Sequence, residues 1–146
     1  MPKFRYKMQN VLDIKRKLES LSQAQFQLAN TNYLREQQKL QELLVRRAGY
    51  DKALKEKMEG RLDVREINRA RADATAAKNM VRRQMMEVHK AEKKLDAARV
   101  ELSQLMKERK TQEKLKEHAF DAFQKEMGRT EAKEIDELVS YSFHSK

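Results

Sequence analysis

The sequence predicts an all-α protein made of two long helices that form an antiparallel coiled-coil hairpin. The chain of 146 residues contains three glycines and a single proline, at position 2, so very few residues can interrupt a helix. An apolar repeat with seven-residue spacing runs through its second half, and one good turn signal lies ahead of that repeat. The apolar fraction of 39% is low for a globular core but sufficient for a narrow seam between helices.

The repeat in the second half is the clearest signal, and it argues against a disordered chain, which the high charge content alone would also allow. Eleven of its twelve positions are apolar, and the residues between them are mostly charged. The second of its two interleaved series is rich in alanine, which permits close approach of a partner helix. The two series are Ile67, Ala74, Val81, Val88, Leu95, Leu102 and Ala70, Ala77, Gln84, Ala91, Ala98, Leu105.

The first half has a looser apolar pattern, which predicts helix one over about residues 3–58. Its spacing slides by about one position along the helix, and this favours only weak supercoiling. The pattern begins as Phe4, Val11, Ile14, Leu18, Leu21, Leu28 and continues as Phe26, Ala29, Tyr33, Leu40, Leu43, Tyr50, Leu54.

A turn is expected at about residues 59–63. Gly60 can adopt the left-handed conformation that ends a helix. Asp63 and Glu66 have the spacing of a capping box, which predicts helix two over about 64–143. Because helices joined by so short a turn must be antiparallel, residues 1–146 are interpreted as a single hairpin in which Leu40 lies near Gln84 and Phe4 lies near Ala119 or Phe120.

Helix two is longer than helix one, so its end is expected to extend beyond the partner helix. This overhang keeps an apolar stripe that nothing else in the chain would cover, and Gly128 is the residue at which its helix could break. An uncovered stripe indicates a partner or self-association. The stripe consists of Phe123, Met127, Ile135, Leu138, Val139 and Phe143.

The net charge of +10 is unevenly distributed. Residues 1–59 and residues 60–110 each carry +6, whereas residues 111–146 carry −2. An arginine-rich stretch opens helix two and is interpreted either as a solvated face or as a docking surface for an acidic partner. Three methionines beside the seam are expected to broaden the core, with an adaptable protein contact as the alternative. These residues are Arg61, Arg65, Arg69, Arg71, Arg82, Arg83 and Met80, Met85, Met86.

The residues argue against catalysis. The chain has no cysteine, its three histidines are far apart, and its glycines form no phosphate-binding loop, so no metal or cofactor is expected. A two-helix hairpin also lacks the concave pocket that catalysis requires. No apolar run is long enough for a membrane span, and the start lacks a signal-peptide core, so a cytoplasmic protein is expected. The scattered tyrosines support only non-specific attraction to nucleic acid.

Three stretches of the chain resemble the FliJ family of flagellar export proteins. The first runs from Lys3 to Glu19 (KFRYKMQNVLDIKRKLE), with two aromatic residues before a charged helix. The others are 113–117 (EKLKE) and 131–138 (EAKEIDEL), and the turn at Gly60 agrees with the family as well. The likeness extends over nearly the whole chain in length and helix order.

The resemblance implies a non-catalytic component of the flagellar type III protein export apparatus that supports flagellum assembly and motility. It implies a cytoplasmic protein peripheral to the inner face of the cell membrane. The expected partners are the export ATPase ring, the cytoplasmic domain of the export gate, and export chaperones. The expected ATPase-binding residues are Phe4, Val11, Leu115, Phe123, Ile135 and Leu138, and those expected at the second partner are Tyr50, Arg61, Arg65, Arg69 and Met80.

One departure from the family pattern concerns the beginning of helix two. Some family members carry bulky aromatic residues there that are thought to contact the export gate, whereas residues 69–77 (RARADATAA) of this chain have none. Two other interpretations remain open on the residues alone. One is a structural coiled-coil adaptor that dimerises through the overhang, and the other is a basic helical hairpin that binds nucleic acid.

Overall fold

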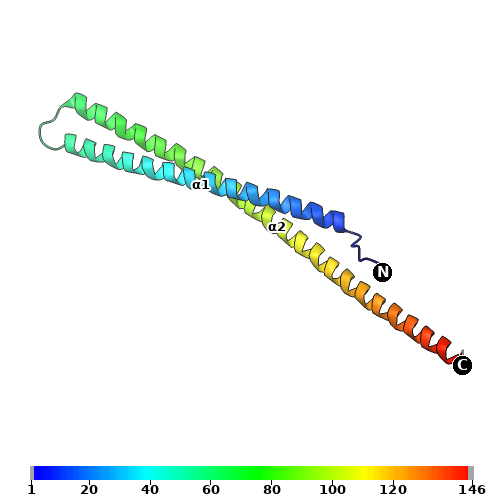
Figure 1. Cartoon of the computed structure of the whole chain (residues 1–146). Coiled ribbons are helices and arrows are strands. Elements are labelled where there is room, and N and C mark those ends of the chain that lie inside the picture. Colours follow the sequence, from blue (N-terminus) through cyan, green and yellow to red (C-terminus); the bar gives the residue numbers. More distant parts are fainter. Residues whose placement is uncertain (1, 145–146) are drawn as a thin grey trace. The chain divides into compact units, whose positions relative to one another are not determined.

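The computed structural model describes residues 2–144, and two long helices account for most of them (Figure 1). Helix α1 spans Gln9–Lys57, and helix α2 spans Val64–His144. No β-strand occurs within the described part of the chain. The two helices contact each other in an antiparallel sense, which confirms the predicted all-α hairpin.

The chain divides into two compact units. One, here called the terminal unit, combines residues 1–21 with residues 103–146. The other, here called the turn unit, consists of residues 22–102. The sequence predicts one hairpin over residues 1–146, and both units contain parts of both of its helices. Contacts between the helices of the terminal unit include the Lys15–Glu108 ion pair and the Phe4–Phe120 ring contact, and the buried residues of the turn unit include Val81 and Leu95.

The turn has the predicted local chemistry. Gly60 has a φ of 82°, the left-handed conformation that a side chain disfavours. Asp63 caps α2 by accepting a hydrogen bond from the backbone N–H of Arg65 at 3.0 Å. The second half of the predicted capping box is replaced by a contact across the turn, because the carboxylate of Glu66 accepts from Lys57 Nζ at 3.0 Å. This ion pair ties the last turn of α1 to the first turn of α2.

The seam of α2 follows the predicted heptad repeat. Between residues 64 and 105, all twelve predicted seam positions are buried or half-buried, and every other residue is exposed. Val81 is only 2% exposed, and Ala77 and Ala91 are equally well covered. Small side chains at these positions allow the backbone of α1 to approach, so the turn unit closes over a narrow core. Arg99 adds a cation–π contact, with its guanidinium carbon 6.0 Å from the centre of the Phe26 ring.

The seam of α1 differs from the prediction in its first part. Ile14, Leu18 and Leu21 were expected in the seam, but they are exposed, and so is Leu28 in the turn unit. The residues that face α2 in the terminal unit include Leu12, Lys15 and Glu19 instead. This face lies opposite the charged stretch of α2, where Glu108 pairs with Lys15 and Arg109 pairs with Glu19.

Helix α1 also begins later than expected, at Gln9 instead of residue 3. The segment before it forms a turn in which the backbone N–H of Gln9 donates to the carbonyl of Tyr6 at 3.1 Å. This non-helical segment lets two aromatic side chains reach α2. The ring of Phe4 lies 5.2 Å from that of Phe120, as the register predicted, and the hydroxyl of Tyr6 donates to Gln112 Oε1 at 2.8 Å.

The methionines beside the seam do not broaden the core. Met80, Met85 and Met86 are 42%, 56% and 62% exposed, so the expected packing role is wrong. The alanine seam already brings the helices together, and the narrow core has no further room for these longer side chains.

Candidate protein-binding surfaces

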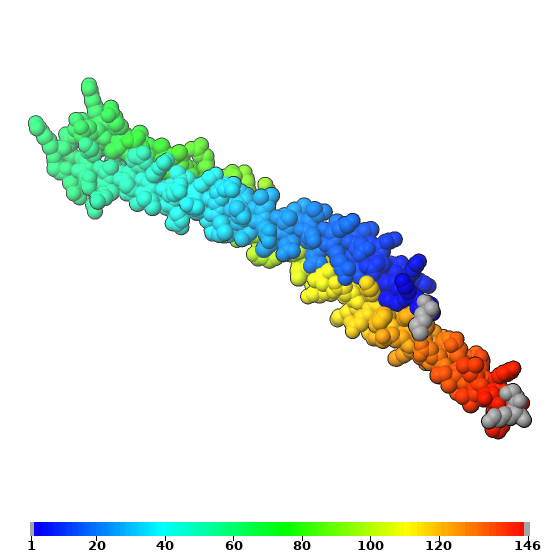
Figure 2. All heavy atoms as spheres, viewed as in Figure 1, coloured from blue at the N-terminus to red at the C-terminus, as the bar shows by residue number. Residues whose placement is uncertain are grey.

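The end of α2 forms an apolar surface that no described residue of the terminal unit covers. From Gly128 onward, every described residue is exposed. The helix does not break at Gly128, where the structure has no neighbouring atom within 4 Å of an added Cβ. On the face shown in Figure 2, no other described segment of the terminal unit lies over this end of α2, which is drawn in orange and red. The overhang, residues 128–144, is therefore a single continuous helix with both sides open to a partner.

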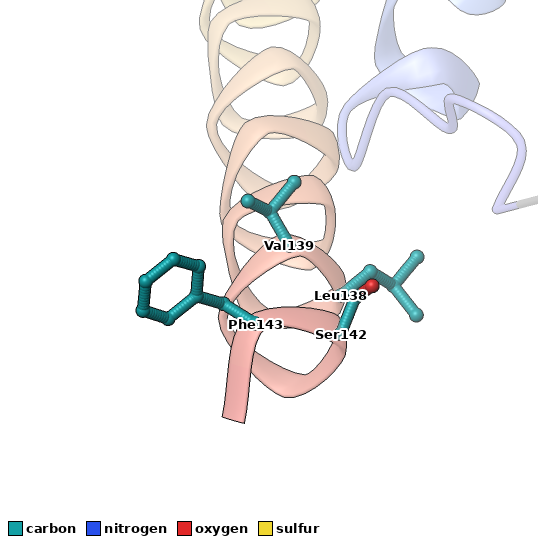
Figure 3. Close-up of a pocket in the computed structure, with 4 residues that line it drawn as sticks. All are labelled: Leu138, Val139, Ser142 and Phe143. Carbon is teal, nitrogen blue, oxygen red and sulfur yellow. The ribbon is translucent and has the colours of Figure 1, made fainter. Parts of the chain in front are cut away.

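The apolar residues of the overhang are spaced three and four apart and therefore lie on one side of the helix. Leu138, Val139, Ser142 and Phe143 line a shallow hollow there, and Figure 3 shows Leu138 and Phe143 projecting away from the helix on either side of it. The exposed fractions of Leu138 and Phe143 are 68% and 80%. Ile135 is exposed one turn earlier. A surface of this kind stabilises a complex by removing apolar area from water.

The residues expected to bind the first partner divide into two groups. Ile135 and Leu138 lie on the open overhang, and Leu115 is 49% exposed. Phe4 and Phe123 instead contact each other, with ring centres 5.5 Å apart, and Val11 is half-buried. These three side chains therefore contribute to the packing of the terminal unit. Val139, Tyr141 and Phe143 extend the exposed surface of the overhang.

A cluster of ion pairs holds the terminal unit together. Lys15 Nζ lies 2.8 Å from Glu108 Oε2, and this hydrogen bond is the main cause that holds the pKa of Glu108 below its ordinary value of 4.5. Arg109 pairs with Glu19 across the helices and with Glu113 along α2 at 2.9 Å. The hydrogen bond to Glu19 is the main cause that raises the pKa of Arg109. The start of α1 is thus attached to α2 by charge in addition to apolar contact.

The residues expected at the second partner are only partly brought together. Tyr50 and Met80 come from different helices and line one hollow with Leu43, Arg46, Asp73, Ala76 and Ala77. Arg61, Arg65 and Arg69 are exposed nearer the turn and do not line this hollow. The structure therefore presents two separate surfaces in the turn unit, one aromatic and one basic.

A further exposed surface was missed because its residues were placed in the seam. Ile14, Leu18 and Leu21 are 55%, 40% and 62% exposed. They form a stripe on α1, here called the α1 stripe. The sequence contains a signal that these residues are exposed. Lys15 and Glu19 each follow a residue of the stripe, and their ion-pair partners on α2 are Glu108 and Arg109. That signal can be used only once the pairing register is known.

Neither metal binding nor membrane spanning is indicated in the part of the chain that the structure describes. Within residues 2–144, no three side chains of the metal-binding types cluster together. No helix in the same range is both long enough and apolar enough to cross a membrane.

Comparison with known proteins gives one match. The family model described as Flagellar FliJ protein matches residues 4–146, essentially the whole chain. No curated protein and no solved structure matches the chain.

Proposed function

Because the chain belongs to the flagellar FliJ protein family, whose members are components of the flagellar export apparatus, we propose that it acts there as a non-catalytic, stalk-like coiled coil. In this proposal the terminal unit binds the export ATPase ring, and the turn unit contacts the cytoplasmic domain of the export gate. The protein is then cytoplasmic and peripheral to the inner face of the cell membrane. Export chaperones are further proposed partners.

The observation that carries the proposal is the overhang of α2. It places five large exposed apolar residues on a helix that has no partner within the described chain: Ile135, Leu138, Val139, Tyr141 and Phe143. Leaving so much apolar area in water is unfavourable, and a partner that covers it regains that free energy. A ring of subunits with an apolar central surface has a suitable shape for a single helix end.

The hollow around Tyr50 and Met80 supports the second contact. It combines an aromatic ring and a thioether with the charges of Arg46 and Asp73. Methionine adapts its shape to a partner surface, and tyrosine contributes both an apolar ring and a hydroxyl. Residues 69–77 of α2 contain no aromatic residue, but Tyr50 of α1 lines the same hollow as Asp73, Ala76 and Ala77. Tyr50 is therefore the aromatic residue that we propose for the second contact.

The proposal is tested by placing charge on the overhang. The double variant Leu138→Glu, Val139→Glu is expected to lose binding to the purified export ATPase and to lose stimulation of ATP hydrolysis. The matched control is Met85→Glu, Met86→Glu, which adds the same charges at two adjacent exposed apolar residues of α2 in the turn unit. Unchanged ATPase binding by the overhang variant would contradict the proposal.

The second contact has its own test. Tyr50→Ala and Met80→Ala are expected to weaken binding to the isolated cytoplasmic domain of the export gate and to leave ATPase binding unchanged. Isothermal titration with each partner separates the two effects. Equal gate affinity for both variants and the unmodified chain would remove the hollow from the proposal.

A further inference from the structure

The α1 stripe has the spacing of a coiled-coil seam, although its three side chains are exposed in the described part of the terminal unit. Ile14, Leu18 and Leu21 are four and three residues apart, which places them on one face of α1. The side of α1 that faces α2 is already occupied by Leu12, Lys15 and Glu19. The stripe is therefore an additional face, and an amphipathic helix has the right shape to cover it.

The charges beside the α1 stripe are basic. Lys17 lies one position before Leu18 and makes no ion pair with any described residue. Arg16 is 3.5 Å from Glu113, with about half of its side chain exposed. Within α1, residues 9–21 contain three basic and two acidic side chains, a net charge of +1, and the segment before α1 adds Lys3, Arg5 and Lys7. A helix that covers this stripe is expected to carry acidic residues at its flanks.

The overhang of α2 has these properties. Residues 128–144 contain four acidic side chains and two basic side chains, a net charge of −2. On a helix, Glu134 and Asp136 lie at the two edges of the face formed by Ile135, Leu138 and Val139. No ion pair among the described residues involves either of these two carboxylates. Apolar spacing and flanking charge both match the α1 stripe.

We propose that two copies of this chain associate by placing the overhang of each copy on the α1 stripe of the other. Such an exchange is self-complementary, because the same two surfaces are used by both copies, and it closes as a dimer with twofold symmetry. Pairing two overhangs would bring two acidic segments of net charge −2 together, and pairing two stripes would bring two basic segments together. Only the crossed arrangement joins opposite charges at both contacts.

The exchange has a consequence for the proposed function. The overhang cannot cover a stripe and enter the ATPase ring at the same time, so the dimer is a form in which the ATPase-binding surface is protected. This competition rests on the proposed function, whereas the self-association rests on the surfaces of the terminal unit alone. The two are therefore tested separately.

Sedimentation velocity of the full chain, without any ATPase, tests the self-association. The unmodified chain is expected to form dimers in a concentration-dependent manner, and dissociation is expected to increase with salt because the flanking contacts are ionic. Leu18→Glu, Leu21→Glu and Leu138→Glu, Val139→Glu are each expected to weaken dimerisation by at least about tenfold. All four residues are exposed, and far-ultraviolet circular dichroism checks that the helices are retained.

Two further variants identify the surfaces. The single charge reversal Lys17→Glu is expected to weaken the dimer, and adding Glu134→Lys to the same chain is expected to restore part of the affinity. Arg61→Glu, near the turn, is the matched control and is expected to leave dimerisation unchanged. A mixture of the two double-glutamate variants is expected to form heterodimers through the one contact that remains intact.

Three results would overturn the proposal. One is a chain that stays monomeric at all concentrations and salt conditions. Another is a dimer that the α1 stripe variant leaves intact, which would indicate pairing through two overhangs. The third is an equal weakening of the dimer by Arg61→Glu and by Lys17→Glu. That result would indicate that the overhang of one copy binds the basic residues near the turn of the other.

Discussion

The side-chain amide of Gln84 on α2 donates hydrogen bonds across the seam to the backbone carbonyl and the carboxylate of Glu36 on α1. The amide lies 2.9 Å from the backbone carbonyl of Glu36 and 2.6 Å from the carboxylate. Gln84 is the one residue that is not apolar among the twelve predicted seam positions of α2. A polar residue at such a position specifies the register of a coiled coil, because its hydrogen bonds form in one alignment only.

Replacing Gln84 with Ala is expected to lower the thermal unfolding midpoint and to raise the pKa of Glu36 toward 4.5. The hydrogen bond from Gln84 is the largest cause of the lowered pKa of Glu36. Calorimetry measures the first effect and a nuclear magnetic resonance titration of the Glu36 carboxyl measures the second. Gln38→Ala, on the exposed surface of the turn unit, is the control. An unchanged Glu36 pKa in the Gln84 variant would contradict the assignment.

Acid is expected to weaken the terminal unit through Glu108. The pKa of this carboxyl is lowered in the folded chain, chiefly by Lys15, so folding favours its charged form. The resulting stabilisation is fully present above the ordinary pKa of 4.5 and is lost as the pH falls through the lowered value. Lys15→Met should therefore lower the unfolding midpoint at neutral pH, and the difference from the unmodified chain should shrink in acid.

Lys17→Met is the control for that measurement, because Lys17 makes no ion pair with the described residues. Its effect on the unfolding midpoint of the unassociated chain should not depend on pH between neutrality and mild acid. A pH-independent loss of stability in the Lys15 variant would contradict the assigned contribution of the ion pair with Glu108.

Truncation of a valine in α2 is expected to be costly only where the valine is buried in the seam. Val81→Ala, at a position 2% exposed, should lower the free energy of unfolding by roughly 2 kcal/mol through lost burial and incomplete closure of the cavity. Val100→Ala, at a position 68% exposed, should be neutral or slightly stabilising because alanine favours helix. Urea unfolding of both variants measures the contrast, and equal destabilisation would contradict the assigned seam.

Two glycine substitutions are expected to have opposite signs. Gly60→Ala forces an alanine into a φ of 82° and should destabilise the turn by roughly 1–2 kcal/mol. Gly128→Ala should stabilise the overhang helix locally by roughly 0.5–1 kcal/mol, since an added Cβ meets nothing within 4 Å. Hydrogen exchange of the amides around each glycine measures both effects. Faster exchange around residue 128 in the alanine variant would contradict the continuous helix.

The α2 seam and the turn could be predicted from the sequence because their signals are local. The strict heptad repeat of α2 identifies its inward face without reference to any partner, and Gly60 with Asp63 marks the chain reversal directly. The contact of Phe4 with Phe120 then follows from counting residues outward from the turn.

The inward face of the first part of α1 could not be predicted in the same way. Aliphatic and charged residues compete for that face, and the outcome depends on what α2 presents opposite. Burying Ile14, Leu18 and Leu21 would leave Glu108 and Arg109 without their partners on α1, and the ion pairs with Lys15 and Glu19 form instead. The start of α1 was missed for a related reason, since Phe4 and Tyr6 gain contacts with α2 that a helical segment would not provide.

The single short turn also determines the order in which the hairpin can assemble. Lys57 and Glu66 are nine residues apart in the sequence, whereas Tyr6 and Gln112 are 106 apart. Closing a short loop costs less conformational entropy than closing a long one, so the contacts beside the turn are expected to form first. Each helix–helix contact that forms then shortens the loop that the following contact must close. Folding should therefore proceed like a zipper from Gly60 toward the termini. In pulsed hydrogen exchange, the amides of the terminal unit should be the last to become protected.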